Sequence, residues 1–271
     1  MTTLAFNEDR WGARARIGMF IVGSEAVPEA EWQAMAPAGI SVHAARVTAP
    51  SPWAPWRADR SGVDLADDLA RGCRQFASMR LAAVVVGHTS SSVIGGAGWD
   101  DAIVREMQAI LGGATAVTTN GLDTMAGLRA VGARRPFLVL PAWYGDAPVE
   151  AALRYYAGQG FDPAGHLRFD PGPRWRDIPR ADLYAEGLAV AQEIEPLYRQ
   201  IVDACPAEAE ADAVFIAGTG FRCVGIVEAL EAALGRPVVT ANQASLWRCL
   251  RLAGLQAPVA RYGRLLTLPG A

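Results

Sequence analysis

The chain contains two related copies of one unit, and this duplication constrains its fold more than any other feature of the sequence. Residues 117–120 (VTTN) precede an apolar stretch ending at 128–132 (LRAVG), and residues 239–242 (VTAN) precede one ending at 250–254 (LRLAG), with equal spacing in both copies. A second pair, 83–89 with 213–219, and a third, weaker pair, 16–22 with 135–141, follow the same order along the chain. Three matches in one order indicate a duplicated unit of strands and helices.

Short apolar runs, typical of strands buried on both faces, alternate with helical stretches. The predicted strands are 17–22, 40–47, 83–87, 115–118, 136–141, 213–217 and 237–240. The predicted helices are 63–79, 100–111, 149–159, 181–204 and 224–234. The Pro- and Gly-rich stretch 162–180 is typical of a connection. The alternation predicts an α/β fold with two pseudo-symmetric lobes, each a short, mainly parallel sheet flanked by helices.

The repeat also predicts how the chain divides between the lobes. Residues 12–118 together with 237–271 are expected to form lobe 1, and residues 119–236 lobe 2, so that the chain crosses between lobes within one structural unit. Ligands of parallel sheets bind beyond the carboxyl ends of the strands. We therefore expect the active site at the interface of the lobes, between the turns that follow their strands.

Composition narrows the classes of function. The formal net charge is −3, and all 25 basic residues are arginine, which gives no basic surface for nucleic acid and removes Schiff-base chemistry. No apolar run approaches the roughly 18 residues that span a membrane, and residues 1–16 are too polar for a secretory signal. The four cysteines lack the spacing of a metal site. We expect a cytoplasmic protein with no nucleic-acid or membrane partner, which can form a homo-oligomer.

Two turns after predicted strands carry the polar residues expected of a site. The run His88-Thr89-Ser90-Ser91-Ser92 follows one strand, and Gly218-Thr219-Gly220 closes the corresponding strand of the second copy. Amides and hydroxyls at such turns bind anions. Tight turns with helix-capping hydroxyls are the alternative, and the presence of two related copies favours a site. Further polar or aromatic residues directly after predicted strands are Ser24, Glu25, Asn120, Trp143 and Tyr144.

Along nearly its whole length the chain resembles the aspartate/glutamate racemase superfamily, in particular its maleate isomerase and arylmalonate decarboxylase branch. The matching segments are 15–18 (ARIG), 36–39 (APAG), 88–92 (HTSSS), 96–100 (GAGWD), 118–119 (TT) and, most specific, 235–247 (GRPVVTANQASLW). The resemblance implies two four-stranded lobes related by a pseudo-dyad, a small carboxylate substrate, and neither metal nor cofactor. Family members use one or two cysteines, one per lobe, to move a proton or attack a double bond beside a carboxylate.

The chain departs from this family at both cysteine positions. The first cysteine corresponds to His88 and the second to Gly218, and the asparagine that isomerases place after the first strand corresponds to Glu25. Two-cysteine racemisation and covalent cis–trans isomerisation are therefore disfavoured. Cys223 lies near the start of a helix, where its thiol pKa could be lowered. It is more than one helical turn from the family position, so a buried structural role is favoured.

His88 and Glu25 are the candidate catalytic residues. An imidazole with a pKa near 6.5 suits acid–base work, and a purely structural histidine is the alternative. An ionised Glu25 would repel a carboxylate 4 Å away by up to ~4 kcal/mol. It is therefore protonated, faces a cationic or hydroxylic part of the ligand, or is itself the base. A helix-capping role near residues 26–31 is equally favoured.

The predicted function is a cofactor-independent enzyme that acts on a small carboxylic acid or related compound. Decarboxylase- or lyase-like chemistry through a stabilised enolate or oxyanion is favoured, with His88 as acid or base and Glu25 as its partner. The predicted substrate-binding residues are Ser24, Thr89, Ser90, Ser91, Asn120, Tyr144, Gly218, Thr219 and Gly220. Three alternatives stay open: a hydrolase using water activated by His88 on an amide, lactone or cyclic imide; a maleate isomerase-like or racemase-like isomerase; and a catalytically degenerate metabolite-binding paralogue.

Overall fold

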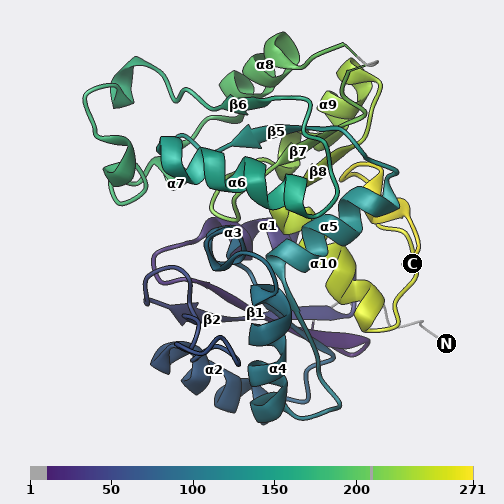
Figure 1. The fold of residues 1–271 in the computed structure, drawn as a ribbon. Coiled ribbons are helices and arrows are strands. Elements are labelled where there is room, and N and C mark those ends of the chain that lie inside the picture. Colours follow the sequence, from purple (N-terminus) through teal and green to yellow (C-terminus); the bar gives the residue numbers. More distant parts are fainter. Residues whose placement is uncertain (1–10, 208–209, 271) are drawn as a thin grey trace, which may run out of the picture.

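Two four-stranded parallel sheets, one in each lobe, form the framework of the protein (Figure 1). The computed structural model describes residues 11–207 and 210–270. The first sheet has the order β2-β1-β3-β4, from β1 (Ala15–Val22), β2 (Ile40–Val47), β3 (Ala83–Val86) and β4 (Ala116–Thr119). The second has the order β6-β5-β7-β8, from β5 (Pro136–Leu140), β6 (His166–Arg168), β7 (Ala213–Ile216) and β8 (Val238–Thr240). The predicted fold class is confirmed, because the two orders correspond strand for strand.

Helices cover both sheets and fill the space between the lobes (Figure 1). Around the first sheet lie α1 (Val27–Met35), α2 (Asp67–Ala77), α3 (Thr89–Gly95) and α4 (Trp99–Leu111). The second lobe contains α6 (Asp146–Gly158), α7 (Leu188–Ala191), α8 (Ile194–Ala204) and α9 (Val227–Leu234). The helices α5 (Asn120–Ala130) and α10 (Ala241–Leu252) pack against each other between the lobes. They follow β4 and β8, the strands of the strongest sequence repeat.

One hydrophobic cluster crosses the lobe boundary. It contains Ile17 and Met19 of β1 together with Leu138 of β5 and Phe215 of β7, all buried. Central strands buried on both faces explain the continuous apolar runs in the sequence. Because the lobes share this core, the turns at their strand ends are held in fixed positions relative to each other.

The predicted division of the chain needs a correction at residue 237. The strand β8 pairs in parallel with β7 and so belongs to the second sheet, although 237–271 were assigned to lobe 1. A short βαβ crossover through α9 returns the chain beside the strand it has just left. The chain passes to the first lobe only after Thr240, where α10 begins and contacts β3 and α1.

Two further differences lie in the second lobe. The predicted connection 162–180 contains β6, a three-residue edge strand that pairs with β5. The predicted helix 181–204 is interrupted, because Gly187 adopts a left-handed φ of 88° and α8 starts only at Ile194. We call residues 169–187, between β6 and α7, the strap.

In the described part of the chain, none of the helices combines the length and apolarity that crossing a membrane requires. Residues 1–10, which carry most of the expectation about a secretory signal, lie outside the described residues.

Candidate active site

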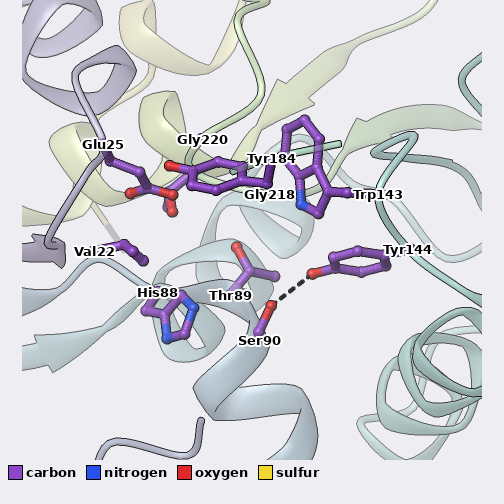
Figure 2. Close-up of a pocket in the computed structure, with 11 residues that line it drawn as sticks. Val22, Glu25, His88, Thr89, Ser90, Trp143, Tyr144, Tyr184, Gly218 and Gly220 are labelled. Atoms are coloured by element: carbon purple, nitrogen blue, oxygen red, sulfur yellow. Dashed lines mark hydrogen bonds between the residues drawn. The ribbon is translucent and has the colours of Figure 1, made fainter. Parts of the chain in front are cut away.

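A cavity of about 200 Å³ lies between the lobes, at the carboxyl ends of the strands (Figure 2). It is smaller than the ~300–1,000 Å³ typical of pockets for drug-sized ligands, so it suits a small molecule. The residues that line it are Val22, Glu25, His88, Thr89, Ser90, Trp143, Tyr144, Tyr184, Gly218, Thr219 and Gly220. Except for Tyr184, which comes from the strap, they follow or end the strands β1, β3, β5 and β7.

His88 stands at the end of β3, held by two neighbours. Its ring stacks on the indole of Trp53, with centroids 4.3 Å apart, and its Nδ1 lies 2.9 Å from Ser91 Oγ. The backbone N–H of Trp53 donates to the same oxygen over 3.0 Å, so the Ser91 hydroxyl can donate to Nδ1. When Ser91 donates in this way, the ring proton of His88 lies on Nε2.

Burial lowers the pKa of His88 to about 3, because the low-polarity surroundings disfavour the imidazolium. The near-neutral pKa assumed in the acid–base interpretation is therefore wrong. At physiological pH the imidazole is neutral, a hydrogen-bond donor and a weak base.

A buried carboxyl group anchors the helix that follows His88. Asp100 accepts hydrogen bonds from Ser92 Oγ (2.7 Å), Thr119 Oγ1 (2.5 Å) and Tyr155 Oη (2.7 Å). These bonds tie α3 to β4 and α6. The turn that carries Thr89 and Ser90 is thus fixed by residues that do not line the cavity.

Two of the hydroxyls that line the cavity are already hydrogen-bonded. Thr89 Oγ1 donates to Asn120 Oδ1 over 2.7 Å, so its proton is unavailable to a ligand. Ser90 Oγ lies 3.0 Å from Tyr144 Oη, a contact that joins the lobes (Figure 2). Because only one of these two hydroxyls donates to the other, the second keeps a proton for a ligand.

The opposite wall is formed by the turn 218–220. Gly218 has a left-handed φ of 97°, and a Cβ there would lie 2.7 Å from Pro141 Cγ. A Cβ on Gly220 would lie 2.6 Å from Glu25 Oε1 and 2.9 Å from Tyr184 Cε2. Glycine at position 220 therefore lets Glu25 and Tyr184 approach the turn.

Glu31 secures this turn from the other lobe. Its carboxylate accepts from the backbone N–H groups of Cys223 (2.7 Å) and Val224 (2.9 Å) and from Asn242 Nδ2 (2.7 Å). Asn242 also donates to the carbonyl of Thr219 over 2.8 Å. Burial raises the pKa of the Cys223 thiol well above its ordinary value, and Cys223 lies outside the cavity lining, in agreement with a structural role.

Glu25 points into the cavity and is 5% exposed. Burial raises its pKa to about 7, against smaller opposing effects of Tyr184 and Arg46. The helix-cap interpretation is wrong, because α1 is preceded by Ala26 as its N-cap residue. Glu25 Oε2 and Tyr184 Oη are both buried and have no hydrogen-bond partner within the described residues.

The structure brings together most, though not all, of the residues predicted for the site. Those that line the cavity are Glu25, His88, Thr89, Ser90, Tyr144, Gly218, Thr219 and Gly220. Ser24 is exposed beside Tyr184, Ser91 lies behind His88, and Asn120 lies behind Thr89. The list of predicted site residues omitted Val22, Trp143 and Tyr184; the sequence marks Trp143 as a residue directly after a strand, whereas no motif marks Tyr184. Over residues 11–207 and 210–270, no cluster of three or more His, Cys, Asp or Glu side chains could hold a metal ion.

Comparison with known proteins places the chain in a family. A family model described as arylmalonate decarboxylase matches residues 59–266. The chain belongs to the arylmalonate decarboxylase family. No protein with curated annotation matches it in sequence.

Several solved structures are similar to this chain in fold, at low sequence identity. A variant of maleate isomerase from Pseudomonas putida S16, crystallised with maleate, has a TM-score of 0.76 and 19% identity, over 93% of this chain and 97% of that chain. Maleate cis-trans isomerase from Nocardia farcinica, bound to TRIS, has a TM-score of 0.73 and 20% identity, over 93% and 98%. Unliganded arylmalonate decarboxylase has a TM-score of 0.71 and 24% identity, over 93% and 98%.

Proposed function

We propose that this protein is a cofactor-independent decarboxylase of a small carboxylic acid, with Glu25 as the group that transfers the proton. The observation that carries the proposal is a buried carboxyl group of near-neutral pKa, with one unpartnered oxygen, facing a small cavity. A perturbed pKa in a cleft is typical of a catalytic group. Membership of the arylmalonate decarboxylase family agrees with this chemistry.

The reaction begins with the substrate's carboxylate leaving as CO₂. The electron pair of the broken C–C bond passes to an adjacent carbonyl group, which becomes an enolate. Hydrogen bonds from the Ser90–Tyr144 pair, from Tyr184 and from Nε2–H of His88 stabilise the charge on oxygen. The protonated Glu25 then donates its proton to the carbon, the enolate returns to a carbonyl, and Glu25 regains a proton from solvent.

The number of proton carriers favours decarboxylation over racemisation. Racemisation through an enolate needs one group to remove a proton and a second to return one to the opposite face, whereas decarboxylation needs a single acid. Within the described cavity lining, Glu25 is the group with a near-neutral pKa, since that of His88 is lowered to about 3. The same low pKa disfavours a hydrolase that relies on His88 to activate water.

Product analysis tests this proposal. Malonic acids, their monoamides and 3-oxo acids carry the adjacent carbonyl that the reaction needs, and incubation of a substrate of this kind in D₂O should yield CO₂ and a product with one deuteron at the reacting carbon. The activity should require protonated Glu25, so kcat/KM should fall about tenfold per pH unit above about pH 7.

Substitution of Glu25 separates catalysis from binding. Glu25→Gln should lower kcat by about 10²- to 10⁴-fold, while Glu150→Gln, on an exposed face of α6, should leave it unchanged. Full activity of Glu25→Gln would refute the role of Glu25. Failure of every acid to release CO₂ would refute the reaction and favour a metabolite-binding protein.

A further inference from the structure

One end of the cavity holds two buried polar atoms that have no partner among the described residues, Glu25 Oε2 and Tyr184 Oη. Both side chains line the cavity and lie close to each other (Figure 2). Buried polar groups in native proteins are nearly always hydrogen-bonded. The Tyr184 hydroxyl lies near enough to the Glu25 carboxyl for each group to affect the pKa of the other, yet Glu25 Oε2 and Tyr184 Oη have no partner at hydrogen-bond geometry. A ligand in the cavity can supply a partner to each of them.

The two atoms need different kinds of hydrogen-bond partner. A carboxylate oxygen of Glu25 accepts a hydrogen bond, and the hydroxyl of Tyr184 can donate one. A carboxamide offers an N–H group and a carbonyl oxygen side by side, so it satisfies both atoms. A carboxylate of the same shape offers acceptors alone, and its charge has the same sign as that of ionised Glu25.

We propose that the site takes a carboxylic acid with a single negative charge, whose second polar group is a carboxamide that faces Glu25 and Tyr184. The proposal rests on the proposed function, in which the substrate carries one carboxylate that leaves as CO₂. The carboxamide N–H donates to Glu25 Oε2, and the Tyr184 hydroxyl donates to the carboxamide oxygen. A dicarboxylate of the same size is discriminated against.

The charges around Glu25 support this assignment. In the described lining of the cavity there is no arginine that could neutralise a second carboxylate. Arg46 of β2 is engaged elsewhere, since it donates to the backbone carbonyl of Glu25 over 2.6 Å and forms an ion pair with Glu29. A dianion would therefore meet Glu25 without a compensating cation.

Catalysis gives a second reason against a dicarboxylate. When Glu25 is protonated, it could hold a second carboxylate by donating its proton to that group. The same proton is the one that the reaction must deliver to carbon. A carboxamide needs only the acceptor oxygen of Glu25, so the proton on the other oxygen remains free for transfer.

The preference for a carboxamide over a carboxylate depends on pH, because it depends on the ionisation of Glu25. The groups that face it are Tyr184 from the strap, Tyr144 after β5, His88 after β3 and Arg46 from β2. Burial raises the pKa of both phenols and lowers that of His88 to about 3, and guanidinium stays charged in proteins. Glu25, with a pKa of about 7, is thus the group that titrates near neutrality, and the preference for the amide grows as pH rises.

Calorimetric titration with succinate and succinamate tests the proposal. These two probes have the same shape, and neither has the activating carbonyl that decarboxylation requires. The wild-type protein should bind succinamate at least about tenfold more tightly than succinate at about pH 8.5. The ratio of the two affinities should be smaller at about pH 6, where Glu25 is mostly protonated.

Variants identify the group responsible for the preference. Glu25→Gln replaces an acceptor by an amide that can donate to a carboxylate, so the preference for succinamate should vanish or reverse at both pH values. Any pH dependence of the affinities that comes from ionisation of the probes themselves persists in this variant. It can therefore be told apart from the pH dependence that comes from Glu25. Tyr184→Phe should weaken the binding of both probes, and the exposed control Glu150→Gln should change neither affinity.

Three results would overturn the proposal: wild-type protein that binds succinate as tightly as succinamate at pH 8.5, a preference that Glu25→Gln leaves intact, or no binding of either probe at 10 mM. The proposed function fails by a different result, because it requires CO₂ release. A preference for succinamate without decarboxylation of any acid would keep the ligand class and reject the reaction.

Discussion

At the scale of single residues, burial acts in opposite directions on the two candidate acid–base groups. It raises the pKa of Glu25 to about 7 and lowers that of His88 to about 3, since an apolar environment disfavours the charged form of either group. The carboxyl thereby gains a near-neutral pKa and the imidazole loses it. A carboxyl group that transfers the proton, paired with a neutral imidazole that polarises a carbonyl, is an established arrangement for enolate chemistry.

The backbone conformation at Gly218 disfavours a cysteine at this position, where the family has its second cysteine. Its left-handed φ of 97° and the closeness of Pro141 to the position of a Cβ atom both disfavour any other residue there. We predict that Gly218→Cys lowers the free energy of unfolding by about 1–3 kcal/mol and leaves turnover without a gain. Urea denaturation under reducing conditions measures the change in the free energy of unfolding.

A matched control for this substitution is Gly113→Cys, where a Cβ meets nothing within 4 Å. This variant should change stability by less than about 0.5 kcal/mol. Equal stabilities of the two variants would contradict the argument from backbone strain at position 218.

At the scale of elements, the strap connects the cavity to the outside of the second lobe. It supplies Tyr184, whose ring meets Trp143 edge-on with centroids 5.1 Å apart. Arg180 of the strap donates to the carbonyl of Ala142 over 3.1 Å, and Arg168 of β6 donates to that of Tyr144 over 3.2 Å. The loop that carries Trp143 and Tyr144 is thus fixed by side chains that never reach the cavity.

We predict that Arg180→Ala lowers kcat/KM by about tenfold, because small displacements of positioning groups are costly in catalysis. The change should appear chiefly in KM, while the free energy of unfolding changes by less than about 1.5 kcal/mol. Steady-state kinetics on a confirmed substrate measures it. Arg176→Ala, at an exposed position of the strap, is the control and should have wild-type kinetics. Similar losses of kcat/KM in both variants would refute the positioning role of Arg180.

The elements also show what the sequence could and could not predict. Strands such as β3 and β7 were predictable, because central parallel strands are apolar throughout and these two repeat each other. The edge strand β6 was not, since three residues beside prolines and glycines carry no periodic signal. The turns that hold His88 and Gly218 were found through the duplication, whereas Tyr184 lies in a strap without a recognisable motif. The roles of Ser91 and Asn120 depend on contacts from distant segments, which one sequence does not show.

At the scale of the whole molecule, Glu25 links stability to pH. Its ordinary pKa of 4.5 applies to the unfolded chain, and its pKa in the folded state is about 7. Between these values the unfolded state ionises while the folded state stays protonated, so stability falls as pH rises from about 4.5 to about 7. Above that range the full cost, roughly 3 kcal/mol, is present.

We predict that Glu25→Gln is more stable than the wild type by up to about 3 kcal/mol at pH 8, and nearly equal to it at pH 5. Effects of the other buried carboxyls are common to both proteins and cancel. Urea denaturation at the two pH values, with Glu150→Gln as the exposed control, measures the difference. An equal stability difference at pH 5 and pH 8 would contradict the raised pKa of Glu25.

The loops that follow β2 and β6 occupy corresponding places in the two lobes but have diverged. Trp53 from the first lies behind His88, whereas Tyr184 from the second enters the cavity. A flat enolate intermediate would have the imidazole and hydroxyl groups on one side and the carboxyl and phenol groups on the other. Only one of its faces would then be turned toward Glu25. New C–H bonds would then form from that face alone, and a substrate with a prochiral carbon would give a single mirror-image product.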